Sequence, residues 1–154
     1  MTQRKPANPA ERMGVYKQIE EVPTEHRLSR YATYYEGRDC WAAWADKALA
    51  THTSDRYAMY VERTGRSWKE HMATCGRHHA LAQPDDVETW AAKILQRCQP
   101  LSAYQIYFTK LEAFYAWLLY HTNHPHCYSP VLMAASLGGA TADIWNSKIE
   151  RRDQ

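Results

Sequence analysis

The sequence lacks any apolar run approaching the ~20 residues that a membrane-spanning helix requires. Its first residues also lack the apolar centre of a secretory signal peptide. The four cysteines, at positions 40, 75, 98 and 127, are widely spaced without a CxxC pair, which favours free thiols over a disulfide framework. These absences predict a cytoplasmic protein that makes no contact with a membrane.

The common catalytic signatures are missing as well. The sequence contains no GxSxG, no P-loop and no HExxH motif. Asp85, Asp86 and Glu88 follow Pro84, as acids do at the start of a helix, where the helix dipole favours negative charge. We therefore expect no catalytic residue and no cofactor, and we interpret the chain as a protein other than an enzyme.

No segment alternates apolar and polar residues between hairpin turns, so the sequence predicts an all-α protein. The longest predicted helix covers 101–122, where apolar residues recur at spacings of three and four after Pro100 and Ser102. Shorter helices are predicted over 39–50, over 54–74 with an interruption at Gly65, over 84–99 and 131–136, and after Gly138. The short connections favour a small bundle of four to five helices in antiparallel or orthogonal packing.

A net charge of +2 is too small to indicate a nucleic-acid partner, but cations gather locally in 52–80. Arginine and lysine neutralise phosphates, and serine or glutamine near the start of a helix can bond phosphate oxygens or base edges. The candidate DNA-contacting residues are Arg56, Arg63, Arg66, Lys69, Arg77, Ser102, Gln105 and Lys110. The alternative is a solvated charged face on an ordinary helical bundle.

Histidines and cysteines crowd two corners of the sequence. One corner holds His121, His124, His126 and Cys127, and the other holds Cys75, His78 and His79. A zinc site drawing on both corners is chemically conceivable, although the spacing fits no standard zinc motif. Because imidazoles also close loops through hydrogen bonds or meet phosphate, we expect no metal ligand among these residues.

Three stretches together resemble one known family. They are GRHHALAQPDDVETW (76–90), YQIYFTKLEAFYAWL (104–118) and HPHCYSPVLMAA (124–135). They are similar to the N-terminal core-binding, SAM-like domain of tyrosine recombinases of the phage-integrase type, most closely to its haloarchaeal branch. In that family a helix opens with Ser or Thr, runs into an FYxWL end and leaves through a loop with proline. The matching residues are Ser102, Phe114, Tyr115, Trp117, Leu118 and Pro130.

The resemblance covers about residues 39–135 and implies a SAM-like helical domain, which we place at 24–136. Residues 1–23, polar and containing three prolines, are expected to form a disordered arm, and 137–154 a C-terminal helix or tail. In this family the domain forms half of a clamp around duplex DNA. By position, the helices that open at Ser54 and Ser102 would face the major groove.

The catalytic motifs of this family are missing from the sequence. The family's catalytic domain carries an arginine, an H-x-x-R motif and a tyrosine nucleophile, whereas no histidine here is followed by arginine three residues later. The expected function is therefore non-catalytic binding of duplex DNA in recombination or integration, or in its regulation, by an archaeal or viral protein.

The sequence leaves open what the C-terminal helix binds. In recombinases terminal helices pack on neighbouring protomers, so this one could pair the chain with a second copy or with a full-length recombinase. Alternatively, the bundle is a protein–protein interaction module that has Ile144, Trp145 and Ile149 as its docking face, with a structural zinc site as an option.

Overall fold

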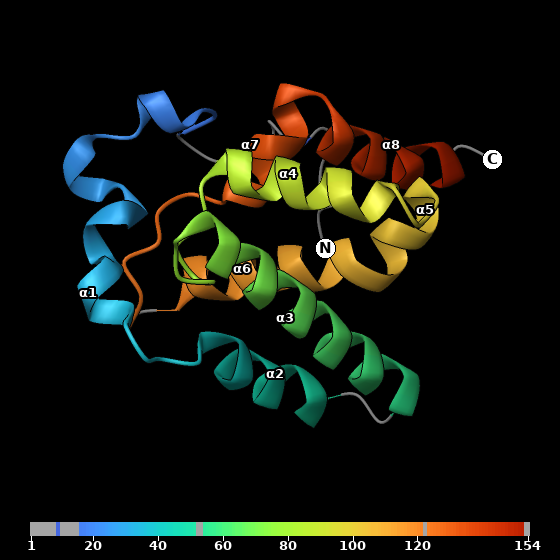
Figure 1. The fold of residues 1–154 in the computed structure, drawn as a ribbon, viewed down its shortest axis with the longest axis horizontal. Coiled ribbons are helices and arrows are strands. Elements are labelled where there is room, and N and C mark those ends of the chain that lie inside the picture. The colour runs from blue at the N-terminus through green and yellow to red at the C-terminus, as the bar shows by residue number, and fades with distance from the viewer. Residues whose placement is uncertain (1–8, 10–15, 52–53, 122, 153–154) are drawn as a thin grey trace, which may run out of the picture.

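The computed structural model describes residue 9 and residues 16–51, 54–121 and 123–152, of which 149–152 are described by their backbone alone. These ranges contain helices and no strand, which confirms the all-α prediction. The main helical elements are α1 (Ala32–Tyr35), α2 (Cys40–Ala50), α3 (Asp55–Cys75), α4 (Pro84–Leu95), α5 (Pro100–Ala103), the π-helical turn η5 (Tyr104–Phe108), α6 (Thr109–Tyr120), α7 (Pro130–Leu137) and α8 (Ala140–Arg152). In Figure 1, α3 crosses in front of α6, with α2 below them and α4, α7 and α8 above.

Local capping explains where α2, α3 and α4 begin. Asp39 accepts a hydrogen bond from the backbone N–H of Ala42 before α2, and Ser54 accepts one from Tyr57 at the start of α3. Pro84 occupies the first turn of α4, where its missing N–H costs nothing. Each of these helix starts agrees with the sequence-based boundary.

Helix α3 is continuous, so the predicted interruption at Gly65 is wrong. Gly65 is buried on the side of α3 that faces α2, beneath the indole of Trp41. The glycine therefore allows two helices to approach closely. The helix ends at Gly76, whose φ of 74° is a left-handed conformation that glycine adopts without strain.

The predicted long helix is present as the run α5–η5–α6, which begins at Pro100 and ends at Tyr120. Ser102 lies inside its first turn and makes no capping bond; Gln99 precedes the helix instead. The π-helical turn interrupts the regular bonding pattern in the middle of this run. Such turns are rare and are found frequently at functional sites.

The C-terminal helix α8 is part of the core rather than a free tail. It packs against α4, α5 and α7, and Ile144 and Trp145 are each 1% exposed. The carboxylate of Glu88 in α4 accepts hydrogen bonds from the first backbone N–H groups of α8. Of the proposed docking face, the two side chains that the structure describes are therefore covered by the protein's own core.

The folded part begins before the predicted boundary at residue 24. Ile19–Glu21 form a short 3-10 turn, and Val22 is 1% exposed in the core. The burial of this valine side chain opposes disorder in the segment that carries it, so 16–23 do not belong to the expected disordered arm. Apart from Pro9, the rest of the arm lies outside the described residues. Within the described ranges, no helix is both long enough and apolar enough to cross a lipid bilayer.

Candidate nucleic-acid interface

Helix α3 separates the predicted cations into two sets. Ser67, Glu70, His71 and Thr74 of this helix line a groove shared with α4. Arg56 and Arg63 lie on the same side of α3, because residues 56, 60, 63 and 67 are spaced by three and four along the helix. Arg66 and Lys69 instead line the opposite groove, which α3 shares with α2. The predicted cationic residues of α3 therefore do not form a single face.

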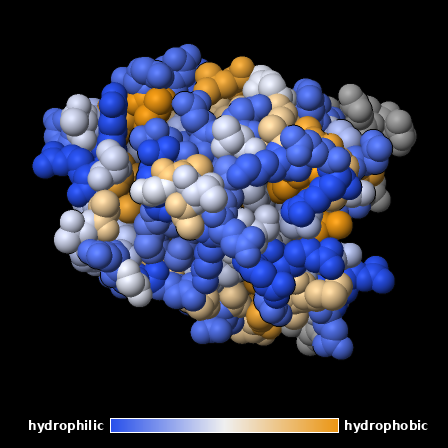
Figure 2. All heavy atoms as spheres, in the orientation of Figure 1, coloured by the Kyte–Doolittle hydropathy of each residue, from blue (hydrophilic) through white to orange (hydrophobic). Residues whose placement is uncertain are grey.

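The groove between α3 and α4 has a volume of about 600 Å³. The opposite wall is formed by Trp90, Lys93 and Ile94 of α4 and by Gln96 and Arg97 of the turn that follows it. Figure 2, in the orientation of Figure 1, shows mostly hydrophilic residues on this face, over α3 as well as over α4. In Figure 1, α5 and η5 lie where α3 and α4 diverge, and Ser102 and Gln105 are exposed on this segment.

Aromatic contacts hold the two walls of the groove together. Trp90 Nε1 donates a hydrogen bond to Ser67 Oγ over 3.0 Å, and the ring of Tyr107 stands perpendicular to the indole of Trp90. On the other side, the hydroxyl of Thr64 donates to the backbone carbonyl of Ile106, which joins α3 to the π-helical turn. Side chains on both walls are therefore carried by helices fixed relative to one another.

Four cationic side chains lie in or beside the groove. Lys93 of α4 and Arg97 of the turn after α4 line it, and Arg56 and Arg63 lie further along the same side of α3. All four are exposed, and none forms an ion pair with another described residue. The guanidinium of Arg97 lies 5.8 Å from the centre of the Tyr107 ring. Glu70 is the one carboxylate among the described lining residues. The groove is therefore a locally positive surface on a nearly neutral chain.

The other three cations of the α3 region are paired with carboxylates. Arg66 forms an ion pair with Glu62 over 2.8 Å, and Lys69 forms one with Asp39 over the same distance. The Arg66–Glu62 pair is largely exposed and the Lys69–Asp39 pair is partly exposed, so phosphate could compete for these cations. The pairing of Arg77 is different because its partner is buried.

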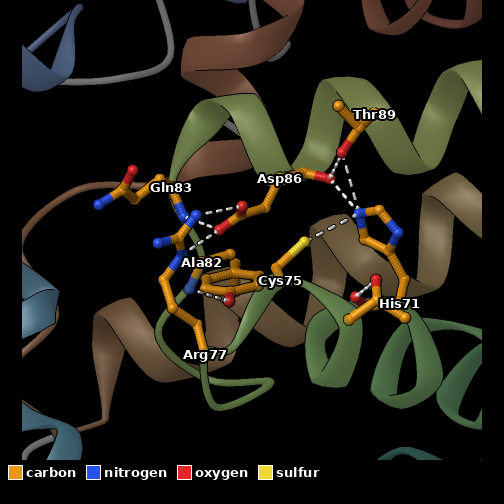
Figure 3. Close-up of polar contacts among 9 residues, drawn as sticks. His71, Cys75, Arg77, Ala82, Gln83, Asp86 and Thr89 are labelled. Carbon is orange, nitrogen blue, oxygen red and sulfur yellow. Dashed lines mark hydrogen bonds and ion pairs between the residues drawn. The ribbon is translucent and has the colours of Figure 1, made fainter.

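Arg77 is a structural residue, and its assignment to a DNA-contacting surface is corrected here. Its Nε and Nη2 donate to the two carboxylate oxygens of Asp86 over 2.7 and 2.6 Å. The side chain of Asp86 is only 4% exposed and also accepts from the backbone N–H of Gln83. Burial alone would raise the pKa of Asp86, but the bonds from Arg77 and Gln83 hold that pKa below its usual value. The pair closes the turn between α3 and α4 (Figure 3).

Lys110 is a second correction, because this lysine is 7% exposed. Its Nζ donates to the backbone carbonyl of Gln105 over 2.6 Å. It also lies 5.6 and 5.4 Å from the ring centres of Tyr57 and Tyr60. Burial lowers the pKa of Lys110. The amine therefore supplies a donor to the π-helical turn from inside the protein and is not presented to a phosphate.

A buried imidazole closes one end of the groove, and the sequence analysis did not select it. His71 Nε2 lies 2.8 Å from the carbonyl oxygen of Asp86, 3.0 Å from Thr89 Oγ1 and 3.6 Å from Cys75 Sγ (Figure 3). Since a carbonyl only accepts, Nε2 carries the proton and Nδ1 accepts from Lys93 Nζ at 3.0 Å. His71 thus positions the ammonium group of Lys93 in the groove.

The proximity of Cys75 and His71 does not make an activated nucleophile. Burial lowers the pKa of His71 and raises the pKa of Cys75. The negative charge of Asp86 raises the pKa of Cys75 further. Both side chains are therefore neutral near pH 7, whereas a nucleophilic cysteine requires a thiolate.

The two predicted histidine corners do not combine into one metal site within the described part of the chain. His124 Nδ1 lies 2.6 Å from the hydroxyl of Tyr35, and His126 Nε2 lies 2.6 Å from the carbonyl oxygen of Ala80. The thiol of Cys75 contacts His71, which was not a predicted ligand. The described residues that could share an ion are Cys40, His78 and His79, and Cys40 was not among the predicted ligands.

Comparison of the chain with protein-family models, with curated proteins and with solved structures found no match in any of the three.

Proposed function

We propose that this chain is a non-catalytic protein that binds duplex DNA through the groove between α3 and α4. The supporting observation is a set of four exposed cations: Lys93 and Arg97 line the groove, and Arg56 and Arg63 lie further along the same side of α3. Each can neutralise one phosphate and release its condensed counterion, which is the main source of sequence-independent affinity for DNA. The hydrogen bond from Lys93 to His71 reduces the freedom that this side chain loses on binding.

Two exposed polar side chains extend this surface beyond the cations. Ser102 and Gln105 lie on the α5–η5 segment, where α3 and α4 diverge. A hydroxyl and a carboxamide can donate to phosphate oxygens, and a glutamine can also bond the edge of an adenine in the major groove. Sequence preference, if the protein has one, is therefore assigned to this segment.

The biological role proposed is in DNA recombination or integration, or in its regulation. The support is the resemblance of the three sequence stretches to the core-binding domain of tyrosine recombinases. In that family the helices corresponding to α3 and to the run α5–η5–α6 face DNA. These two elements carry four residues of the proposed surface beside the groove: Arg56, Arg63, Ser102 and Gln105.

Fluorescence anisotropy of a labelled DNA duplex, titrated with the full chain across a series of salt concentrations, tests this function. If four cations each neutralise one phosphate, log K should fall against log salt concentration with a slope of about −3 to −4. Absence of binding at low salt, or an affinity that does not respond to salt, would contradict the proposal. A single-stranded oligonucleotide of the same length serves as the comparison for duplex specificity.

A further inference from the structure

Cys40, His78 and His79 come together where the start of α2 meets the loop between α3 and α4. The atoms with which they could bind a metal ion all lie within 4.8 Å of one another. Cys40 and His79 are buried, at 3% and 8% exposure, while His78 is partly exposed. The cluster is thus held inside the protein and remains reachable from solvent at His78.

Packing fixes both imidazoles from more than one side. The ring of His79 stacks on that of His78 with a centroid distance of 4.1 Å, and its other neighbour is the ring of Phe114. His78 Nε2 lies 2.7 Å from the carbonyl oxygen of Arg38, to which it donates. His79 Nε2 accepts from the backbone N–H of Trp41 over 3.2 Å. These contacts hold both rings against the start of α2.

We propose that this cluster binds a divalent transition-metal ion, with zinc as the expected metal. One thiolate and two imidazoles are a donor set that zinc uses in proteins, and a sulfur ligand disfavours magnesium and calcium. Binding releases the thiol proton of Cys40 to solvent, and each imidazole ligates through a neutral nitrogen. The ion takes up no electrons, so the step needs no oxidant or reductant.

The observed spacing requires a small closure of the site. With metal–nitrogen bonds of ~2.1 Å and a metal–sulfur bond of ~2.3 Å, tetrahedral ligand atoms lie about 3.3 to 3.8 Å apart. The cluster, which spans up to 4.8 Å, must therefore contract by about 1 Å. At each imidazole the metal takes the place of one hydrogen bond. Three such bonds join the two rings to the backbone of Arg38, Trp41 and Ala80, and the longest is the 3.2 Å bond from Trp41 to His79.

Asp39 is placed to complete the coordination. Its Oδ1 lies 3.9 Å from His79 Nε2, and the same oxygen caps α2 and pairs with Lys69. A carboxylate and a thiolate together neutralise a divalent ion, which offsets the cost of holding that charge in a half-buried site. A water molecule reaching the site past His78 is the other source of a fourth ligand. Either way, the ion would tie the start of α2 to the loop after α3.

Cobalt(II) provides the test, because a thiolate bound to cobalt gives a charge-transfer absorption in the near ultraviolet. Full-length protein freed of metal by chelation should bind one cobalt ion with this absorption, and zinc should remove the absorption by displacement. Cys40→Ser should abolish the band and weaken zinc binding by more than about tenfold. Cys75→Ser is the matched control, since this cysteine contacts His71 outside the cluster, and it should retain both properties.

A wild-type protein that shows no thiolate band at stoichiometric cobalt would overturn the site, as would equal losses in the two cysteine variants. Circular dichroism reports whether Cys40→Ser is folded. If it is not, His78→Gln decides the question, because this side chain is partly exposed and glutamine can still donate to the Arg38 carbonyl. Zinc affinity reduced by more than about tenfold in His78→Gln supports the site, and an unchanged affinity refutes it.

Discussion

The indole ring of Trp41 lies directly over the Cα atom of Gly65. A methyl group added at Gly65 would overlap three atoms of this indole, including Nε1, which donates to the carbonyl of Val61 over 3.2 Å. Trp41 is 4% exposed and also packs on Trp44 and Phe114. The distance between α2 and α3 is therefore set by the absence of a side chain at one residue.

Gly65→Ala should lower the free energy of unfolding by about 1 to 3 kcal/mol, because the added methyl group forces Trp41 out of a packed core. Helix propensity acts in the opposite direction, since alanine is favoured over glycine by ~1 kcal/mol in a helix interior. Urea denaturation measures the net effect. In a Trp41→Leu background the penalty should shrink, and an equal penalty in both backgrounds would show that the indole is not its cause.

Arg77→Met should destabilise the fold by about 3 kcal/mol near pH 7, because it leaves the carboxylate of Asp86 buried without its cation. The matched variant Arg63→Met removes an exposed arginine and should change stability by less than about 0.5 kcal/mol. Denaturation curves of the two proteins make the comparison. Similar stabilities would mean that the Arg77–Asp86 pair does not support the α3–α4 turn.

The double variant Arg63→Glu with Lys93→Glu should weaken duplex DNA binding by at least about tenfold and reduce the salt slope by about 2. Its control, Arg66→Glu with Lys69→Glu, replaces the same residue types and alters net charge equally, but on the α2 side of α3. We expect a clearly smaller loss in the control. Equal losses, measured by anisotropy at one salt concentration, would indicate a response to net charge alone.

Lys110 should be protected from amine acylation in the folded protein, because its Nζ is buried and bonded to a backbone carbonyl. Lys47 is exposed on α2 and serves as the comparison. Mass spectrometry after brief treatment with an acylating reagent should find Lys47 modified and Lys110 largely intact, with the difference lost in urea. Modification at equal rates in the folded state would place Lys110 on the surface after all.

Stability should fall as the pH is lowered from about 6.5 toward 4, in part because of His126. Burial lowers the pKa of His126 to about 4, whereas an unfolded histidine titrates near its usual 6.5. Only the unfolded chain therefore takes up this proton in that interval. The group contributes about 1.4 kcal/mol of destabilisation per pH unit while pH lies between the two pKa values.

The groups that face His126 do not cancel the loss of stability that follows from proton uptake by the unfolded chain. Tyr35, Tyr115 and His124 surround its ring. Burial raises the pKa of both tyrosines, which therefore stay neutral in this interval, and lowers the pKa of His124, which changes stability in the same direction as His126. His126→Gln should make the decline of stability with falling pH shallower. His26→Gln, at an exposed position, should leave the wild-type slope unchanged. A slope unaffected by His126→Gln would assign the decline to other groups.

Short-range chemistry was sufficient to predict where α2, α3 and α4 begin and where α3 ends. Asp39, Ser54, Pro84 and Gly76 act on backbone groups within one turn, so their effect can be read from neighbouring residues, and the structure begins and ends helices at these positions. The all-α class follows from the same local patterns. Gly65 shows the limit of such reasoning, because a glycine that breaks an isolated helix can instead be required where another helix approaches.

The candidate site depended on partners that are distant in sequence. The packing of α2 on one side of α3 and of α4 on the other decided which cations of α3 lie on the side of each groove. Tertiary contacts also directed Arg77 to Asp86, placed Lys110 beneath two tyrosines, and brought Cys40 beside His78 and His79. The spacing of charges along a helix determines which residues share a side. Which of these sides is exposed to solvent depends on how the neighbouring elements pack, because folding favours the arrangement that buries the most apolar surface.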